Sequence, residues 1–318
     1  MAIEASSHGL DQRRLDGVGG EIGVFTSFSR DHLDYHGDEA AYLAAKARLF
    51  GEVMPAGAYA LVSATADRAG SILETAGRAG LAAMTYGVGG TALALKSLTP
   101  DGLGQVLEID GMAGARKVKL DHFAPFQAEN ALAAAGVVML SGADPLDAVQ
   151  AIETLDQPQG RMQRAAVTSS GAPIYVDYSH KPAALEAALK ALRSQTQGRM
   201  TVVFGCGGDR DAGKRPMMGE IASRLADRVI VTDDNPRSED PAKIRSAILQ
   251  AAPGAEEIAD RAAAIRAAVI DVGASDTVLI AGKGHEQGQI VGNAVLPFDD
   301  VNAARIAAGA IRGEGEAV

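Results

Sequence analysis

The amino-acid sequence predicts an α/β protein with a largely parallel sheet, and three observations support this fold class. Short β-rich runs alternate with Ala-rich amphipathic stretches, which is typical of strands joined by crossover helices. Pro and Gly interrupt this alternation at residues 156–163, DQPQGRMQ, after which it restarts. The length of 318 residues suits about two domains. We therefore expect one domain at 1–157 and a second, doubly wound domain at 158–318.

In the first domain, most elements are expected from apolar spacing. Residues 39–50 predict a helix because their apolar side chains recur near a spacing of 3.6. The helix at 145–154 has Pro in its first turn, where Pro is favoured. Residues 81–120 hold several short β-rich runs separated by Gly turns. The expected strands are 22–28, 58–63, 84–88, 93–98, 106–109 and 117–120, and the other expected helices are 67–79 and 126–140.

In the second domain, polar motifs follow three of the expected strands. GCGGDRD follows the strand at 200–204, TDDNPR ends the strand at 228–232, and GKGHE follows the strand at 277–281. In doubly wound sheets, ligands bind beyond the carboxyl ends of the strands, so the three motifs predict a ligand site. The remaining expected elements are a strand at 174–178 and helices at 183–194, 216–226, 241–251, 262–272 and 299–310.

Composition excludes several classes of protein. The chain has 30 basic and 40 acidic residues, and a net charge of −10 argues against a nucleic-acid binder. The longest apolar run, Ala131–Leu140, is too short to span a bilayer. The single cysteine, Cys206, excludes an internal disulfide framework, and the N-terminus has no apolar signal region. We expect a cytoplasmic protein that binds neither nucleic acid nor a membrane.

One phosphate-binding motif is nearly complete but fails. Gly208 to Lys214 matches the first seven positions of the P-loop G-x-x-x-x-G-K-[ST]. The eighth position is Arg215, where a hydroxyl should face Mg²⁺. The segment is also rich in Asp and Arg, so we do not interpret it as a P-loop.

Six segments, taken in order, resemble the Mur ligases, and in particular the MurE type that adds meso-diaminopimelate to UDP-N-acetylmuramoyl-L-alanyl-D-glutamate. They are EASSHGLDQRR (4–14), SRDHLDYHGDEAAYLAAKARLF (29–50), VDYSHKPAALEAAL (176–189), VVFGCGGDRDAGKRPMMG (202–219), VTDDNPRSEDP (231–241) and AGKGHEQGQ (281–289). The resemblance implies part of the central ATPase domain followed by a complete, Rossmann-like C-terminal domain. It also implies an ATP-dependent amide ligase of peptidoglycan synthesis that works through an acyl phosphate. Ser179 and Lys181 depart from the Ala and Thr of many relatives, which affects only the fine geometry expected there.

The resemblance implies Mg²⁺ as a cofactor, held by Glu4, His32 and a carbamylated Lys46. A carboxylate suits this hard cation, whereas His is an unusual ligand for it. Carbamylation needs the neutral amine, so the site has to lower the lysine pKa from about 10.4. Each of the three residues also has an ordinary alternative. Glu4, at the end of an expected strand, would be a surface residue near the start of the chain. His32 would cap a helix or lie in the core, and Lys46 would be a solvated residue of a helix.

The resemblance also implies the substrate contacts. Arg210 and Arg237 offer planar forks suited to a carboxylate, although loop arginines are often simply solvated. The residues implied for the UDP-muramoyl-dipeptide are Ser6, Gln12 and Arg14; for diaminopimelate, Arg210, Asp234, Asn235, Pro236, Arg237, Gly282 and Glu286; for ATP, Asn130 and Arg161; and for catalysis, Lys46, Asp177 and His180.

Two features of the Mur ligases are not found in this sequence: a Gly-rich P-loop ahead of EASSHG and a uridine-nucleotide domain. We expect the segment that carries them to be a partner, and the 318-residue chain alone to turn over almost no ATP. One alternative hypothesis is a non-catalytic fragment that only binds diaminopimelate or a partner chain. Another is a related Mur or folylpolyglutamate-type ligase, against which DNPR and GKGHE argue.

Overall fold

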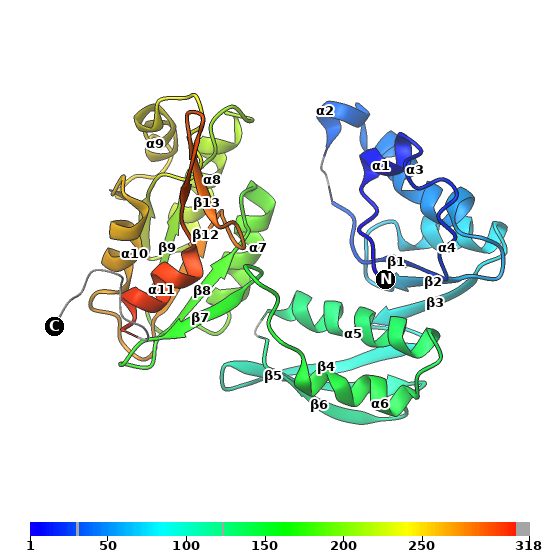
Figure 1. The fold of residues 1–318 in the computed structure, drawn as a ribbon. Coiled ribbons are helices and arrows are strands. Elements are labelled where there is room, and N and C mark those ends of the chain that lie inside the picture. The colour runs from blue at the N-terminus through cyan, green and yellow to red at the C-terminus, as the bar shows by residue number, and fades with distance from the viewer. Residues whose placement is uncertain (30–31, 123, 310–318) are drawn as a thin grey trace. The chain divides into compact units, whose positions relative to one another are not determined.

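The computed structural model describes residues 1–29, 32–122 and 124–309 (Figure 1). The chain forms two compact units, Met1–Leu155 and Asp156–Val318, so the division lies two residues before the expected boundary at 157. Each unit contains a six-stranded sheet. Within the described ranges, no helix is long and apolar enough to cross a membrane. Arg30 and Asp31 of the second motif, and Ala310 at the end of the last expected helix, lie outside these ranges.

The sheet of the first unit is parallel at one end and antiparallel at the other. Its strands lie in chain order, with β1 to β4 paired in parallel and β4 to β6 paired antiparallel. The short strands expected between residues 81 and 120 therefore form the last four strands of one sheet. The strands are β1 (Ile22–Phe25), β2 (Tyr59–Ser63), β3 (Ala82–Gly87), β4 (Leu93–Asp101), β5 (Gly104–Gly111) and β6 (Arg116–Leu120).

Strand β2 is buried on both faces because successive side chains point to opposite sides of the sheet. Val62 belongs to a cluster with Phe50 and Ile72, whereas Leu61 belongs to a second cluster with Leu132. Two faces with apolar cover explain why β2 reads as a continuous apolar run. The helices of this unit that the sequence predicts are α3 (Glu39–Arg48), α4 (Ala69–Arg78), α5 (Pro125–Leu140) and α6 (Pro145–Gln150).

Several local expectations for the first unit are wrong. Residues 1–6 form no strand, so Glu4 does not end one. The expected helix at 39–50 ends at Arg48 and continues as a π-helical turn, Leu49–Val53. Two short helices, α1 (Ser7–Asp11) and α2 (Leu33–His36), were not expected. They are about one turn long, which is too short for apolar periodicity to reveal.

The second unit is a doubly wound sheet, as predicted. The strand order is β11-β10-β9-β12-β8-β7, and all neighbours are parallel except β7 and β8. The strands β7, β11, β13 and β14 were not expected, because they carry few apolar residues in a buried pattern. β13 and β14 form a separate hairpin. The strands are β7 (Gln163–Val167), β8 (Pro173–Asp177), β9 (Met200–Phe204), β10 (Arg228–Val231), β11 (Glu256–Glu257), β12 (Thr277–Ala281), β13 (Gly288–Val291) and β14 (Ala294–Pro297).

Helices cover both faces of this sheet (Figure 1). α10 and α11 contribute Ile265 and Ala304 to a cluster with Ile174 and Ile280 of the sheet, whereas α7 and α8 pack together on the other face. This two-sided cover leaves the carboxyl ends of the parallel strands as the place where polar loops gather. The helices are α7 (Pro182–Arg193), α8 (Lys214–Leu225), α9 (Pro241–Leu249), α10 (Arg261–Val269) and α11 (Asp300–Ala307).

Candidate functional site

In the second unit, the three strands that carry polar motifs are adjacent, as predicted. β9 lies between β10 and β12, and all three run in parallel, so their carboxyl ends share one edge of the sheet. β8 follows β12 in the same direction and ends at Asp177. Every site residue expected in this unit lies in a loop at this edge, except Arg161, which precedes β7, and Asp177 itself, which ends its strand.

A hydrogen-bonded network of three side chains joins the DNPR and GKGHE loops. The Asn235 Oδ1 accepts from the Lys283 Nζ at 3.0 Å, and the Asn235 Nδ2 donates to the Glu286 Oε2 at 2.8 Å. The Lys283 Nζ also lies 3.3 Å from the Glu286 Oε2, and the Lys283 side chain is fully buried. Glu286 keeps a third of its side chain exposed. A carboxylate is thereby held at a fixed place where a ligand ammonium can reach it.

Gly282 lets the Asp234 carboxylate lie directly against the backbone of the next loop. A Cβ at Gly282 would lie 2.6 Å from the Asp234 Oδ2, and the Gly282 φ of +117° is unfavourable for other residues. The Gly282 N–H donates to the Asp177 carbonyl at 3.0 Å. Asp234 is almost fully buried, so this loop holds a second carboxylate at the same sheet edge, beside Gly282.

The two predicted carboxylate-binding arginines are held differently. The Arg237 Nη1 donates to the Gly208 carbonyl at 2.9 Å, and the Arg237 backbone has a left-handed φ of +53°. Its N–H donates to the Ile290 carbonyl at 3.0 Å. Arg210 is exposed, and its Nη1 donates to the Asp209 carbonyl at 3.4 Å. Arg237 is therefore fixed by the fold, whereas Arg210 can move toward a ligand.

At the close of β8, Asp177 and His180 have shifted pKa values. Burial raises the pKa of Asp177, against the hydrogen bonds from the Ser179 hydroxyl and from the Met162 N–H at 2.7 Å, which lower it. Burial also lowers the pKa of His180. The His180 Nδ1 lies 2.9 Å from the Tyr178 carbonyl, which only accepts, so Nδ1 carries the proton. The neutral imidazole then leaves Nε2 as an acceptor.

An aromatic cluster surrounds Tyr178 at the same edge. The Arg161 guanidinium carbon lies 4.7 Å from the centre of the Tyr178 ring, a cation–π distance. The rings of His180 and His285 lie 4.5 and 5.0 Å from the Tyr178 ring. The predicted Arg161 is therefore placed beside the predicted His180 through a tyrosine that the sequence did not single out.

The rejected P-loop is a loop with a different structure. Lys214 is the first residue of α8, and its Nζ donates to the His180 carbonyl at 2.8 Å. Arg215, which replaces the P-loop hydroxyl, is buried and bonds to both carboxylate oxygens of Glu239, at 2.8 and 2.9 Å. This segment supports the adjacent loops.

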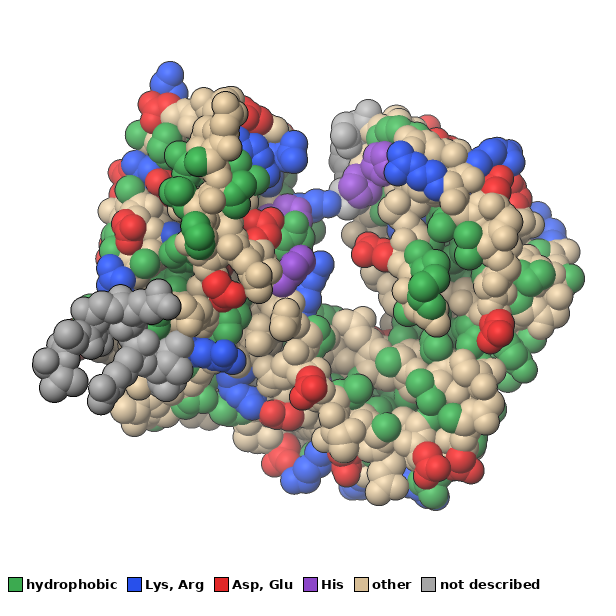
Figure 2. Space-filling model, viewed as in Figure 1, with side chains coloured by type: hydrophobic (Ala, Val, Ile, Leu, Met, Phe, Trp, Pro, Cys, Tyr) green, Lys and Arg blue, Asp and Glu red, His purple; other side chains and the backbone are tan. Residues whose placement is uncertain are grey.

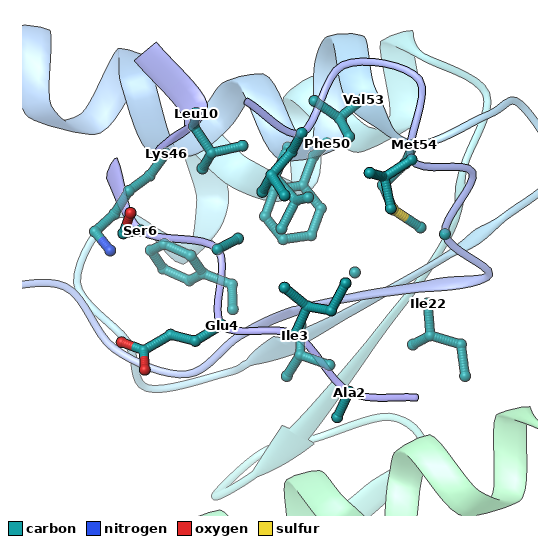
Figure 3. A pocket seen from close by; sticks show the side chains of 18 of the residues that line it. Ala2, Ile3, Glu4, Ser6, Leu10, Ile22, Lys46, Phe50, Val53 and Met54 are labelled. Carbon is teal, nitrogen blue, oxygen red and sulfur yellow. The ribbon is translucent and has the colours of Figure 1, made fainter. Parts of the chain in front are cut away.

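In the first unit, four predicted site residues line one cavity of about 950 Å³: Glu4, Ser6, His32 and Lys46. Figure 3 shows the polar ends of Glu4, Ser6 and Lys46 gathered on one side of this cavity. Apolar side chains, among them Ile3 and Phe50, line the rest. The cavity therefore has a polar end, which suits an anion or a metal, and an apolar end.

Short helices and aromatic rings set the positions of these groups. Ser6 caps α1, since its Oγ accepts from the Gly9 N–H at 3.1 Å. The His32 ring lies 4.8 Å from the His8 ring, and the Lys46 Nζ lies 5.1 Å from the centre of the Tyr42 ring. Figure 2 shows histidine side chains in purple close to Lys and Arg side chains on this part of the first unit. The His32 and Lys46 side chains thus each lie beside a ring of the same unit.

The fit of Mg²⁺ depends on modification of Lys46. Among the residues that the structure describes, no group of three or more His, Cys, Asp and Glu side chains is placed to hold a metal ion. Glu4 offers the kind of oxygen that Mg²⁺ prefers, whereas an ammonium offers no ligand. A carbamate on Lys46 would supply the second anionic oxygen donor.

Three other expected residues of the first unit do not line the cavity. The Gln12 Nε2 donates to the Tyr35 hydroxyl at 3.1 Å, and Arg14 is exposed in the turn after α1. On α5, the Asn130 Nδ2 donates to the Gln127 Oε1 at 3.2 Å. The structure thus brings together Glu4, Ser6, His32 and Lys46 but places Gln12, Arg14 and Asn130 elsewhere on the unit.

Comparison with known families matches both units. The Mur ligase middle domain matches residues 1–138, and the Mur ligase glutamate ligase domain matches residues 160–284. A protein of Caulobacter vibrioides is 51% identical over 95% of this chain, and one of Brucella melitensis is 51% identical over 94%. Both are named UDP-N-acetylmuramoyl-L-alanyl-D-glutamate–2,6-diaminopimelate ligase. The chain spans 62% and 61% of their lengths.

Solved structures show the same fold. A structure named as the same diaminopimelate ligase is 37% identical, with a TM-score of 0.65 over 96% of this chain and 64% of its own. A folylpolyglutamate synthase of Mycobacterium tuberculosis, in complex with ADP and AMPPCP, has a TM-score of 0.67 at 22% identity and covers 92% of this chain and 65% of its own. At that identity, the second similarity shows the fold alone.

Proposed function

Because this chain belongs to the Mur ligase family, as its motifs predicted, we propose that it takes part in the ATP-dependent joining of meso-diaminopimelate to the D-Glu carboxylate of UDP-N-acetylmuramoyl-L-alanyl-D-glutamate. One observation carries the proposal: relatives that are 51% identical over 94–95% of the chain have the name of this ligase. The reaction belongs to the synthesis of a peptidoglycan precursor, and we place it in the cytoplasm.

The chemistry requires two anions, a carboxylate and the γ-phosphate of ATP, to meet. In the proposed reaction, a carboxylate oxygen attacks the γ-phosphorus, ADP leaves, and the amine of diaminopimelate then displaces phosphate from the acyl phosphate. Mg²⁺ held by Glu4, His32 and the carbamate of Lys46 would neutralise phosphate charge. The cavity of the first unit supports this role, because all three of these residues and Ser6 line it. Ser6, Gln12 and Arg14 are proposed to contact the muramoyl-dipeptide.

Diaminopimelate has two ammonium and two carboxylate groups, and the strand-end loops of the second unit offer partners for both. We assign an ammonium to Glu286 and Asp234, because both carboxylates lie at the same sheet edge. We assign a carboxylate to Arg237, with the exposed Arg210 as the second fork. Asn235, Pro236 and Gly282 shape the pocket, since Asn235 is fixed by Lys283 and Gly282 leaves room for Asp234.

Asp177 and His180 are proposed to act near the phosphates, together with Arg161, whereas Asn130 is proposed to contact the adenine. The His180 Nε2 is an acceptor at neutral pH and suits a proton leaving the attacking amine. Arg161 lies on the Tyr178 ring and keeps a cation beside His180. These roles follow from the motif positions, and the geometry supports the grouping of Asp177, His180 and Arg161 within the second unit.

The second candidate function is binding of diaminopimelate, or of a partner chain, without catalysis. The observation that favours it is the 208–215 segment, where Arg215 is paired with Glu239 and no hydroxyl is available for a P-loop. A folylpolyglutamate-type activity gains no support, because that similarity is one of fold.

Two measurements on the 318-residue chain separate the candidates. The first is calorimetric titration with meso-diaminopimelate and with lysine, and the second is ATP-dependent phosphate release with the UDP-muramoyl-dipeptide, with the product identified by mass. Binding of diaminopimelate in preference to lysine, with formation of the tripeptide product, establishes the ligase. Binding without product supports the non-catalytic alternative only where a Mur ligase segment that carries the P-loop and the uridine-nucleotide domain has been added, because the 318-residue chain alone is expected to turn over almost no ATP. Absence of any preference for diaminopimelate contradicts the assignment of the substrate.

A further inference from the structure

Two fully buried charged side chains that the sequence analysis did not single out, Arg261 and Asp300, lie behind the strand-end loops of the second unit. The Arg261 Nε and Nη2 each lie 2.7 Å from a different carboxylate oxygen of Asp300. Both side chains have no exposed surface. Burial lowers the pKa of Arg261, but Asp300, Asp234 and Glu286 together raise it by more, so the guanidinium stays charged.

The remaining Arg261 donors reach backbone carbonyls at the ends of two strands. The Nη2 donates to the Ala281 carbonyl at 3.0 Å, at the last residue of β12. The Nη1 donates to the Asp233 carbonyl at 3.3 Å, just after β10. The next residues along the chain are Gly282 and Asp234, both assigned above to diaminopimelate. One guanidinium therefore ties together the starts of the two ligand loops.

Arg261 and Asp300 also lie at the starts of two helices that pack together. Arg261 is the first residue of α10 and Asp300 the first residue of α11, and these helices pack together on one face of the sheet. Each helix is capped by the preceding aspartate: Asp260 accepts from the Ala263 N–H at 2.7 Å, and Asp299 accepts from the Asn302 N–H at 2.8 Å. The ion pair thus connects the starts of two helices to the starts of the two ligand loops.

We propose that the buried Arg261–Asp300 ion pair is a positioning device that fixes loops 233–237 and 282–286 relative to each other, and thereby sets the affinity for the amino-acid substrate. The effect on affinity rests on the proposed function, whereas the effect on the loops does not. A planar fork with parallel donors is needed, because it bonds to one carboxylate and to two carbonyls at once.

A buried ion pair is by itself weak evidence of a stabilising role. Replacing both partners by apolar residues is often neutral or stabilising, whereas removing one partner leaves an unpaired buried charge. The two roles, folding and positioning, can therefore be separated in one variant. A double substitution of Arg261→Met with Asp300→Leu removes both charges and also removes the donors to Ala281 and Asp233.

The experiment compares this double variant with a matched control at the other end of β10. There, the Arg228 Nε and Nη2 lie 2.7 and 2.9 Å from the two Glu256 carboxylate oxygens, and the Arg228 Nη1 donates to the Ala267 carbonyl at 2.8 Å. The control carries Arg228→Met with Glu256→Leu. Amide hydrogen exchange of the two loops, calorimetric binding of meso-diaminopimelate and the melting temperature are measured for each protein.

We expect the double variant at 261 and 300 to melt within a few degrees of the wild type. Its exchange rates at 233–237 and 282–286 should rise about tenfold or more, with a similar loss of affinity. In the control variant, the exchange rates of the two loops and the affinity for diaminopimelate should each change by less than about twofold. Wild-type exchange rates in both loops of the folded double variant would overturn the proposal.

A second variant keeps the proposal testable if the double variant fails to fold. Arg261→Lys retains the buried charge but loses the fork, so loop exchange should rise while the protein stays folded. Unchanged exchange in this variant also overturns the proposal. If the wild type itself binds no diaminopimelate, the proposed function fails, and the exchange rates still decide whether the ion pair positions the loops.

Discussion

The two units hold their polar candidate groups in opposite ways. In the second unit, Asn235 and Lys283 are buried and bonded to each other and to Glu286, so the site has a fixed geometry. In the first unit, Glu4 and Ser6 are exposed on a segment with no regular structure ahead of α1. The difference teaches that loops at the ends of parallel strands can fix the polar groups of a site through their own hydrogen bonds. In the cavity of the first unit, the arrangement of the polar groups depends on a bound ligand or a modification.

Charge gives the same contrast. In the second unit, buried charges are held in ion pairs, as Arg261 with Asp300 and Lys283 with Glu286. The cavity of the first unit brings Glu4 and Lys46 to one wall without the group of ligands that a metal ion needs, as far as the described residues show. Carbamylation of Lys46 would change its charge from positive to negative and complete that group.

The largest expected effect tests this dependence on modification. Lys46→Ala should lower the turnover of the complete enzyme by on the order of a hundredfold or more, because a ligand proposed to hold Mg²⁺ against the transferring phosphate is lost. Bicarbonate or acetate should restore part of the rate. The measurement is phosphate release, and Lys96→Ala, an exposed lysine of the same unit, is the control. Full activity of the Lys46 variant would show that no carbamate is needed there.

The interlocked network of the second unit is tested by Lys283→Met. We expect the free energy of unfolding to fall by about 2 kcal/mol, because Glu286 and Asn235 lose a buried partner. Lys190→Met is the control, because Lys190 pairs with Glu186 at 2.9 Å on the surface of α7 and should matter by less than about 0.5 kcal/mol. Unfolding free energies are measured by urea denaturation. Equal losses in the two variants would mean that the buried network stabilises the unit no more than a surface ion pair does.

Arg237 tests whether a fixed guanidinium selects the substrate. Arg237→Ala should raise the KM for diaminopimelate at least about tenfold, because one carboxylate of the substrate loses its guanidinium partner. A tenfold change corresponds to about 1.4 kcal/mol of binding free energy. The KM for ATP should stay within about twofold. Arg224→Ala, which removes an exposed arginine paired with Glu186 at 3.0 Å, should change neither value. An unchanged KM for diaminopimelate would mean that Arg237 only braces the Gly208 loop.

The second unit could be predicted from the sequence because its signals are local and repeated. Each buried strand reads as a short apolar run, and each is followed by a motif, so the shared edge of β9, β10 and β12 follows from the parallel order. Lys283 stood within a quoted motif but carried no sign of burial. Arg261 and Asp300 gave no signal at all, since a charged residue at a helix start is ordinarily exposed and their pairing joins positions 39 residues apart.

The first unit was harder to predict, for physical reasons. α1 and α2 are too short for periodicity, and their bounds depend on tertiary contacts such as the bond between the Ser7 hydroxyl and the His36 ring at 3.0 Å. The strand expected before Ser6 does not form, and β structure needs a bonded partner strand. The roles assigned to Glu4, His32 and Lys46 stay predictions, although the structure brings the three to one cavity.

The smallest expected effect concerns His180, whose pKa is lowered by burial and then by Lys214 and Lys181. The unfolded chain binds a proton near pH 6.5, whereas the folded chain resists it, so the unfolded state holds more protons below that pH. Wild-type stability should therefore fall as pH drops from 7.5 to 5.5, and His180→Gln should reduce this fall by less than about 1 kcal/mol. Urea denaturation at the two pH values measures it. The same pH dependence in both proteins would show that His180 titrates as in water and would weaken its role as a neutral acceptor at the strand edge.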